Sequence, residues 1–252
     1  MNLIYKIPSF SYMLDAVLAV QSEGQSDFFT ESLFRVYPQF EQEKMKRMTP
    51  DEKREYLTGT LKGIYQENEP LFMQKQKAYQ RHWDASRIVV EEAFSEIFAM
   101  DLRDEFNDMT GYLSLNPVCP RYLDTHTFDL FYLNSERGAM GLALHEITHF
   151  VWFKRWNLLF HDDPAEYEAP HVKWLLSEIV VDAILQETRL NALNPYRDEN
   201  VYAYFYHCNI GGKPLLSAVS ELFTAHPIES FMQESFALVK RYETEIRSAE
   251  ER

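Results

Sequence analysis

The chain has 252 residues, 46% of them hydrophobic and 15% aromatic, which is enough apolar material for one large domain or for two lobes that share a cleft. Its 39 acidic residues outnumber the 25 basic ones, and the formal net charge of -14 opposes binding to a phosphate backbone, so nucleic acid is not an expected partner. We find no apolar run long enough to span a membrane and no secretory signal, and therefore expect a cytoplasmic protein with no membrane partner.

Helical signals dominate the N-terminal third of the chain. Thr49, Pro50 and Glu52 form a capping box with proline at the first helical position, and this pattern predicts a helix that begins at Pro50. Pro70 predicts the start of a second helix that runs towards Met100, because apolar residues follow it at helical spacing.

The pattern changes in the middle of the chain. From 111 to 134, aromatic and aliphatic residues are separated by Asn-Pro and Pro, which predicts two or three short strands, the last over 127–133. That strand leads into a helix over 136–156 with apolar residues around most of its circumference, as a buried helix has. The remaining elements are a polar loop (161–170), an apolar helix (171–190), a segment ambiguous between strand and helix (202–206), and two helices (215–225 and 228–248).

These elements predict an α+β fold that is predominantly helical and carries a small sheet. The two cysteines, Cys119 and Cys208, are too few for a disulfide framework. Reduced, half-buried thiols are the simpler interpretation, and the sequence leaves open whether the two residues pair.

The helix predicted over 136–156 carries three titratable groups in an apolar run, LALHEITHFVW. His145 and His149 lie four residues apart, so on a helix they project from one face and can offer ring nitrogens to one metal ion. Glu146 lies about 100° round the helix from His145, where it can reach a water on that ion without binding the ion itself. This is the H-E-x-x-H pattern of zinc peptidases.

A third metal ligand is expected on the next apolar helix, where Glu178 and Asp182 are the only charged residues of WLLSEIVVDAIL. They share one helix face, and two unpaired buried carboxylates would be strongly destabilising. A metal with its histidines resolves this problem if Glu178 binds zinc and Asp182 accepts the spare N–H of a ligand histidine. Ion pairs with Lys173 or Arg189 are the alternative.

HEITH followed by an E-x-x-x-D helix resembles the gluzincins, the thermolysin-like clan of zinc metallopeptidases, over residues 127–185. The resemblance implies a zincin-like, two-lobed domain with its small sheet next to the active-site helix. We expect residues 1–157 to form an N-terminal lobe and residues 158–252 a helical C-terminal lobe that carries Glu178. The resemblance also implies that the strand over 127–133 pairs with the substrate backbone.

Metzincins, a rival class, would need glycine and histidine where the chain has Trp152 and Arg155. That class is therefore excluded. A tetrahedral intermediate at zinc also needs a proton-bearing side chain for its oxyanion. The segment that begins at His207, HCNIG, is similar to the pattern around the thermolysin-like transition-state histidine.

We take His207 and Tyr206 as catalytic candidates for the oxyanion, with Tyr202 and Tyr204 as neighbouring possibilities. The alternative is that these side chains are ordinary core residues that have satisfied their hydrogen bonds. The segment itself does not decide between the two.

The expected function is zinc-dependent hydrolysis of a peptide or protein substrate, in which Glu146 activates a zinc-bound water as general base. Two other classes remain. A catalytically degenerate zincin would bind zinc and act as a regulatory or protein-interaction module, against which the intact Glu146 argues. A helical scaffold would hold no metal at all.

Overall fold

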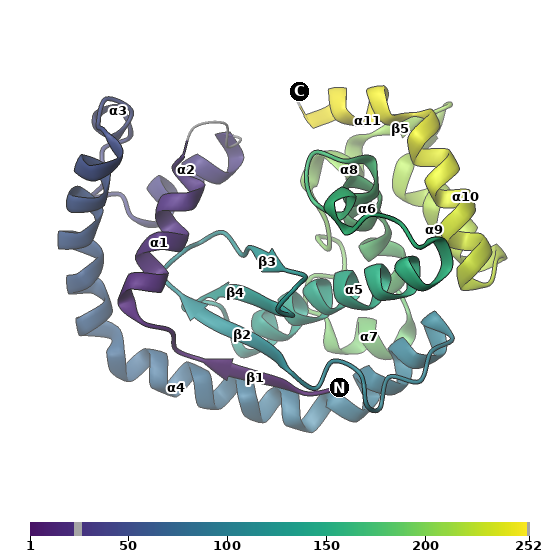
Figure 1. Cartoon of the computed structure of the whole chain (residues 1–252), viewed down its shortest axis with the longest axis horizontal. Helices are drawn as coiled ribbons and strands as arrows, with labels where there is room; N and C mark the ends of the chain where they lie inside the picture. Colours follow the sequence, from purple (N-terminus) through teal and green to yellow (C-terminus); the bar gives the residue numbers. More distant parts are fainter. Residues whose placement is uncertain (23–26, 251–252) are drawn as a thin grey trace. The chain divides into compact units, whose positions relative to one another are not determined.

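The protein is mainly helical, and the computed structural model describes its residues 1–22 and 27–250. Beside the helices, the described residues form a four-stranded mixed sheet and a small two-stranded hairpin, so the predicted α+β class is confirmed (Figure 1). Within the same residues, none of the helices has the length and apolar character needed to cross a membrane. Both cysteines are thiols, with Cys208 buried and Cys119 half-buried.

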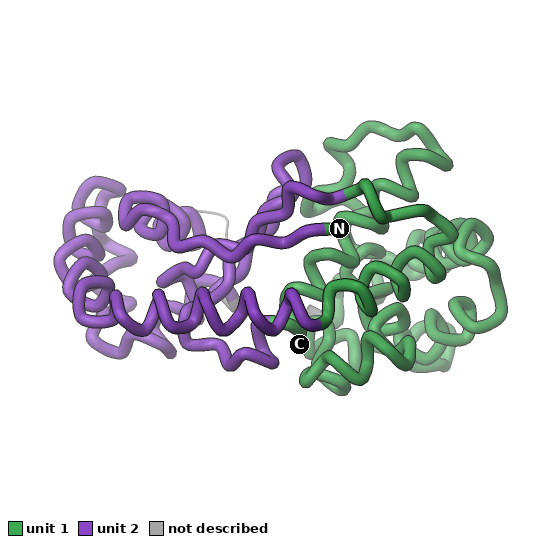
Figure 2. Tube along the Cα trace, turned by 90° about the horizontal axis from the view of Figure 1, so that it is seen from below, with its two compact units in different colours: residues 1, 86–105, 140–252 green, residues 2–85, 106–139 purple. Residues whose placement is uncertain are grey.

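The chain divides into two units, which Figure 2 colours separately. Unit 1 comprises residue 1, residues 86–105 and residues 140–252, and unit 2 comprises residues 2–85 and 106–139. This division differs from the predicted lobes, 1–157 and 158–252. Most of the helix that carries the two histidines belongs to unit 1, where its Trp152 contacts Phe231 of a later helix.

The four-stranded sheet belongs to unit 2 and has the order β1-β2-β4-β3. β1 and β2 are parallel, as are β2 and β4, whereas β3 runs antiparallel to β4. Gly111 of β2 lies against Tyr5, since a Cβ at that position would come within 2.8 Å of the Tyr5 ring. The strands are β1 (Leu3–Lys6), β2 (Met109–Ser114), β3 (Arg121–Tyr122) and β4 (Thr127–Phe131).

The strand that was expected to bind a substrate backbone, β4, is not at the edge of its sheet. Its first residues, Thr127 and Phe128, pair with β2 on one side and with β3 on the other. The Asp129 N–H also donates to the Pro120 carbonyl at 2.9 Å. This part of the strand therefore offers no free edge to a substrate, contrary to the expectation.

The helix α4 (Pro50–Phe98) is longer than the sequence predicts. It begins at Pro50 as expected, where Glu52 accepts a hydrogen bond from the Thr49 N–H at 2.8 Å. It then continues through Pro70, so the predicted second start is wrong. Leu61 and Phe72, on either side of that proline, are fully buried, and their packing outweighs the hydrogen bond that proline cannot make. The part of α4 within unit 2 is bent in Figure 1, as an interior proline favours.

The remaining helices of unit 2 lie between β1 and α4 in the sequence, and those of unit 1 follow β4. Trp152 is at the centre of the unit 1 core, with Phe98 on one side and Phe231 on another. The elements are α1 (Phe10–Val20), α2 (Asp27–Val36), α3 (Gln42–Met45), α4 (Pro50–Phe98), α5 (Glu136–Phe160), η1 (Pro164–Tyr167), α6 (Val172–Leu185), α7 (Thr188–Leu193), α8 (Ala203–His207), β5 (Asn209–Ile210), β6 (Lys213–Pro214), α9 (Leu215–Ala225), α10 (Ile228–Arg241) and α11 (Glu243–Glu250).

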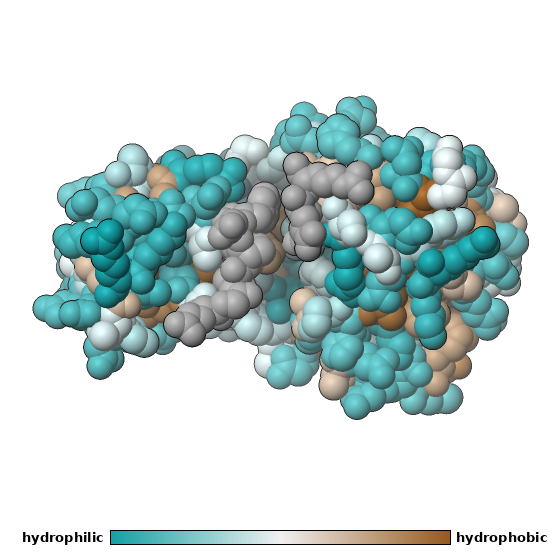
Figure 3. All heavy atoms as spheres, turned by 90° about the horizontal axis from the view of Figure 1, so that it is seen from above, coloured by the Kyte–Doolittle hydropathy of each residue, from teal (hydrophilic) through white to brown (hydrophobic). Residues whose placement is uncertain are grey.

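Two predicted helices of unit 1 are each divided in two. The helix expected over 171–190 ends at Leu185, and α7 begins after Glu187, whose carboxylate accepts a hydrogen bond from the Leu190 N–H at 3.0 Å. The helix expected over 228–248 is interrupted at Tyr242. The ambiguous segment 202–206 is mostly helical. On the face drawn in Figure 3, hydrophilic side chains dominate and hydrophobic ones form separate smaller patches.

Candidate metal centre

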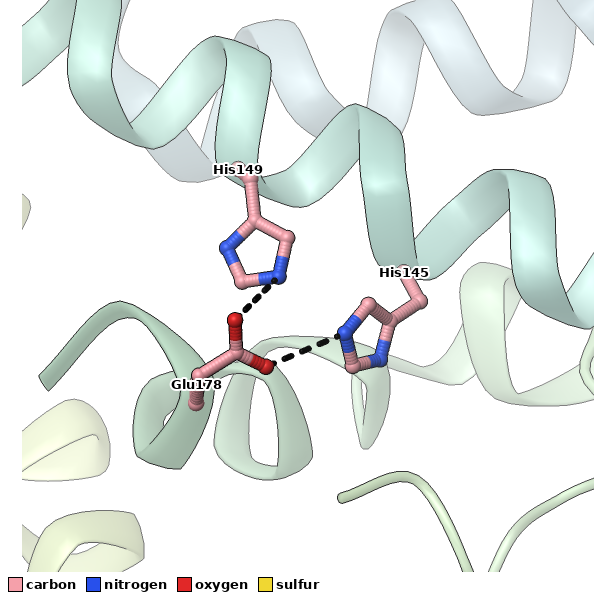
Figure 4. Close-up of side chains that lie close together, drawn as sticks. All are labelled: His145, His149 and Glu178. Carbon is pink, nitrogen blue, oxygen red and sulfur yellow. Dashed lines mark ion pairs between the residues drawn. The ribbon is translucent and has the colours of Figure 1, made fainter. Parts of the chain in front are cut away.

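Two buried helices of unit 1 carry the candidate site. α5 places His145 and His149 on one face at neighbouring turns, and α6 presents Glu178 to them (Figure 4). His149 is fully buried and Glu178 is only 3% exposed. Such burial of an acid and two imidazoles is costly unless the groups satisfy one another or a common ion.

The three side chains converge on one point. The His145 Nε2 atom lies 3.4 Å from Glu178 Oε2, and the His149 Nε2 atom lies 3.5 Å from Glu178 Oε1. One ligand atom from each residue lies within 4.8 Å of the others. Ligand atoms about 2.1 Å from a tetrahedral ion lie about 3.4 Å apart, and each histidine nitrogen lies at about this distance from one of the two carboxylate oxygens. His145, His149 and Glu178 are therefore close enough to bind a metal ion.

The orientation of His145 is set by a backbone group. Its Nδ1 atom lies 2.9 Å from the carbonyl oxygen of Asn200. Because a carbonyl only accepts hydrogen bonds, Nδ1 must carry the hydrogen and donate it. The neutral ring then has its lone pair on Nε2, the atom that faces Glu178.

The charges around His145 affect its protonation. Burial by itself lowers the pKa of His145, but the hydrogen bond to Glu178 and the negative charges of Glu146 and Glu178 outweigh it. The pKa of His145 therefore lies above its ordinary value. A proton on His145 competes with a cation for the same carboxylate.

Asp182 is linked to His145 through Asn200. It was expected to accept the spare N–H of a ligand histidine, but its Oδ1 atom instead accepts hydrogen bonds from Asn200 Nδ2 at 3.0 Å and from the Tyr206 hydroxyl at 3.3 Å. Asn200 lies between the two groups, with its carbonyl on His145 and its side-chain amide on Asp182. A direct contact with His145 is therefore wrong, because the Asn200 carbonyl occupies that place.

The alternative partners proposed for the α6 carboxylates bind elsewhere. Lys173 pairs with Asp162 at 2.6 Å, and Arg189 pairs with Glu96 at 2.7 Å. Both cations are therefore engaged with other acids, and the alternative of ion pairs at Glu178 and Asp182 is not what the structure shows.

Glu146 lies between the two histidines on α5 and is 4% exposed. In the described part of the chain, the converging ligand atoms belong to His145, His149 and Glu178, and Glu146 is outside that group. Its charge is nevertheless close enough to raise the pKa of His145. Glu146 therefore stands beside the group of candidate ligands and not within it.

The two oxyanion candidates occupy different surroundings. Tyr206 is half-buried and belongs to the network around Asp182, and burial together with that carboxylate raises the pKa of Tyr206 to about 12. Its hydroxyl therefore stays protonated, and its one hydrogen is donated to Asp182. His207 is exposed at the end of α8. Tyr202 and Tyr204 are half-buried and stack on one another with ring centroids 5.8 Å apart.

Sequence reasoning missed Asn200. Its contact with His145 is made by a backbone carbonyl, which every residue has, and no side-chain pattern marks the position. The only available signal is that a loop rich in polar residues, NPYRDEN, follows the helix that carries Glu178 and Asp182. A polar residue that is nearly inaccessible, as Asn200 is, becomes visible only in the structure.

No family model matches the chain, and comparisons with the curated proteins and with the solved structures found no match. The geometry of the three side chains therefore carries the interpretation of the site. The gluzincin resemblance, drawn from HEITH and the E-x-x-x-D helix, stays a prediction.

Proposed function

We propose that the protein is a zinc-dependent peptide hydrolase of the gluzincin type, with a zincin-like active site built on α5 and α6. One observation carries the proposal: His145, His149 and Glu178 converge within 4.8 Å while a buried glutamate, Glu146, stands beside them on the same helix. A structural role would explain buried ligands, but it would not require an additional buried acid next to them.

His145, His149 and Glu178 would hold the zinc ion. Imidazole nitrogens with a carboxylate oxygen are a ligand set that zinc favours, and three protein ligands leave one position of a tetrahedral ion open, as catalytic sites do. When bound, zinc would supply a Lewis acid that polarises a carbonyl and lowers the pKa of water. The separations of 3.4 and 3.5 Å between the histidine nitrogens and the carboxylate oxygens support this choice.

Glu146 would act as the general base. It takes the proton from the attacking water and passes it to the leaving amine of the peptide. Its burial supports this role, because a carboxylate shielded from bulk water is a stronger proton acceptor than an exposed one. For the oxyanion, Tyr206 and His207 stay the two candidates: Tyr206 donates its single hydroxyl hydrogen to Asp182 and would have to turn it towards a substrate, and His207 is exposed.

The substrate class follows from the proposed chemistry and from charge. A net charge of -14 disfavours nucleic acid, and a peptide or protein supplies the carbonyl and leaving amine that these residues serve. The expected partner is therefore a peptide or protein substrate.

The proposal is tested by metal content and turnover. Protein purified without chelator should hold about one zinc ion per chain, and it should cleave members of a broad peptide library followed by mass spectrometry. A chelator should abolish cleavage and added zinc should restore it. His145→Ala should remove both metal and activity, whereas His226→Ala, which changes an exposed histidine, should leave both intact.

The outcomes separate the hypotheses. A chain that holds no zinc and takes up none would contradict the proposal and favour a scaffold without metal. A chain that holds zinc but cleaves no peptide in the library would favour the degenerate zincin, a zinc-binding regulatory or interaction module.

A further inference from the structure

We infer that Asn200 is a positioning residue, which holds His145 with its hydrogen on Nδ1, and that the segment 194–200 is packed against α5 for this purpose. The inference rests on the proposed function because it concerns a ligand of the same metal site. It goes further by assigning a role to a loop that the proposed chemistry does not use.

Every polar group of Asn200 is hydrogen-bonded. Its carbonyl accepts from His145 at 2.9 Å, and its N–H donates to the Tyr206 oxygen at 2.8 Å. Its side-chain amide donates to Asp182 at 3.0 Å, and its side-chain oxygen accepts from the amide of Asn194. Asn200 is only 7% exposed. Bonds in several directions fix the residue, so the direction of its carbonyl is fixed as well.

The loop reaches α5 at a glycine. Gly141 lies one turn before His145, and a Cβ at this position would come within 2.7 Å of the Tyr196 ring and 2.8 Å of Asn194 Oδ1. Asn194 is 1% exposed and holds the loop together, since its Oδ1 atom also accepts from the Tyr196 N–H at 2.9 Å. Glycine is unfavourable inside a helix, and here its place is explained by the close approach of the loop.

A backbone carbonyl is well suited to holding His145 with its hydrogen on Nδ1. It can only accept, so it selects the ring form with hydrogen on Nδ1 and leaves the Nε2 lone pair for the metal. It adds no further negative charge beside Glu178 and Glu146. Asp182 then acts by orienting the Asn200 amide, which requires an acceptor oxygen but not a charge.

The experiment compares zinc affinity and the ring state of His145 in matched variants. Zinc affinity is measured by competition with a chelator of known affinity, and the hydrogen on Nδ1 is followed by ¹⁵N NMR of the histidine rings before and after zinc is added. Asn200→Ala keeps the backbone carbonyl but removes the side-chain bonds to Asp182 and Asn194 that fix its direction, so it should weaken zinc binding by about 10–100-fold and should shift the Nδ1–H signal of His145. Asn191→Ala is the matched control, because that amide donates to Gln186.

Two further comparisons guard against a variant that only damages the fold. Gly141→Ala changes no hydrogen-bonding group and favours the helix, yet it pushes the loop away, so zinc binding should weaken and the His145 signal should shift. Asp182→Ala should weaken zinc binding as well. Asp182→Asn should recover most of that loss, because its side-chain oxygen can still accept from Asn200 and Tyr206.

The results distinguish this inference from the proposed function. If the wild-type chain binds no zinc, the proposed function fails and the inference fails with it. If the wild type binds zinc and both Asn200→Ala and Gly141→Ala bind it equally well with unchanged ring signals, the inference alone is overturned. If Asp182→Asn loses as much affinity as Asp182→Ala, charge rather than orientation is what Asp182 supplies, and the role given to it here is wrong.

Discussion

Both units of the protein bury an acidic side chain inside an apolar segment. The free-energy cost of removing that side chain from water is lowered in a different way in each unit. In unit 1, Glu178 is surrounded by two imidazoles whose nitrogens face its two oxygens. In unit 2, Asp129 of β4 is fully buried and accepts a hydrogen bond from the Tyr12 hydroxyl at 2.8 Å. Burial raises the pKa of Asp129 to about 7, although the hydroxyls of Tyr12 and Ser114 oppose the rise.

The comparison shows that burial of an acid is not by itself a sign of a metal site. Burial of Asp129 favours its protonated form, and the hydrogen bonds from Tyr12 and Ser114 only partly oppose this. Glu178 has neighbours that can share a cation with it. In the sequence the two acids look alike, TFDLF and LLSEIV, and what separates them is the set of groups that folding brings to each.

The largest effect on zinc binding is expected when Glu178, the proposed acidic ligand of unit 1, is removed. Glu178→Ala should weaken zinc binding by more than the roughly 10–100-fold that loss of a supporting group costs, because it removes one of three ligands. Glu166→Ala changes an exposed acid that pairs with Lys173 and serves as the control. Elemental analysis and chelator competition measure both. Equal losses in the two variants would mean that Glu178 is not the third ligand.

The second prediction distinguishes Glu146, the proposed base, from the three proposed ligands. Glu146→Gln keeps the shape of the side chain but cannot carry a proton, so metal content should survive while peptide hydrolysis falls by about 10²–10⁴-fold. Metal analysis and a peptide assay on the same preparation check this. Release of zinc by Glu146→Gln would make Glu146 a ligand or structural partner, and full activity would assign the base to another group.

The third prediction concerns Asp129 of unit 2, where removal of the acid should stabilise the fold. An acid whose pKa is raised by folding favours the folded state below its unfolded pKa of about 4, and that advantage is lost as pH rises through about 7. Asp129→Asn keeps an acceptor for Tyr12 and cannot ionise. It should therefore raise the free energy of unfolding by a few kcal/mol (order of magnitude) at pH 8, with the gain shrinking towards pH 4.

Urea unfolding of Asp129→Asn and of wild type at several pH values measures this difference. Asp124→Asn, which changes an exposed acid of the same unit, should show no such trend. If Asp129→Asn destabilises the protein at pH 8, the carboxylate form of Asp129 makes favourable contacts, and the contrast with Glu178 disappears.

The smallest expected effect is the pH dependence of zinc binding. Because the pKa of His145 lies above its ordinary value, a proton should begin to displace zinc at a higher pH than at an exposed histidine. Below that pKa, affinity should fall about tenfold for each pH unit from this proton alone. Chelator competition between pH 5.5 and 8 measures the slope, and an affinity that stays constant over this range would show that His145 does not bind the ion.

The sequence predicts the candidate ligands because they obey local rules. His145, Glu146 and His149 lie on one helix, where spacing alone decides which side chains share a face. Glu178 is conspicuous as a charge within an apolar helix. Both features are properties of short segments, and α5 and α6 are found close to their predicted positions.

The features that the sequence does not predict depend on contacts between distant segments. β1 is only four residues long and becomes a strand by pairing with Met109–Ser114 far along the chain. α4 continues through Pro70 because tertiary packing on both sides of it outweighs a local rule. Asn200 reaches His145 through its backbone, and Asp182 loses its expected contact for that reason.

The interleaving of the two units has a consequence for biosynthesis. Unit 2 is made of residues 2–85 and 106–139, so all of it has been synthesised once residue 139 has been added. Residues 86–105, which belong to unit 1, are made before that point and must wait for 140–252. The candidate metal ligands come later still, since Glu178 follows His149 by a whole loop and part of a helix. A nascent chain that stalls between them therefore carries His145 and His149 without Glu178, and only continued translation completes the candidate site.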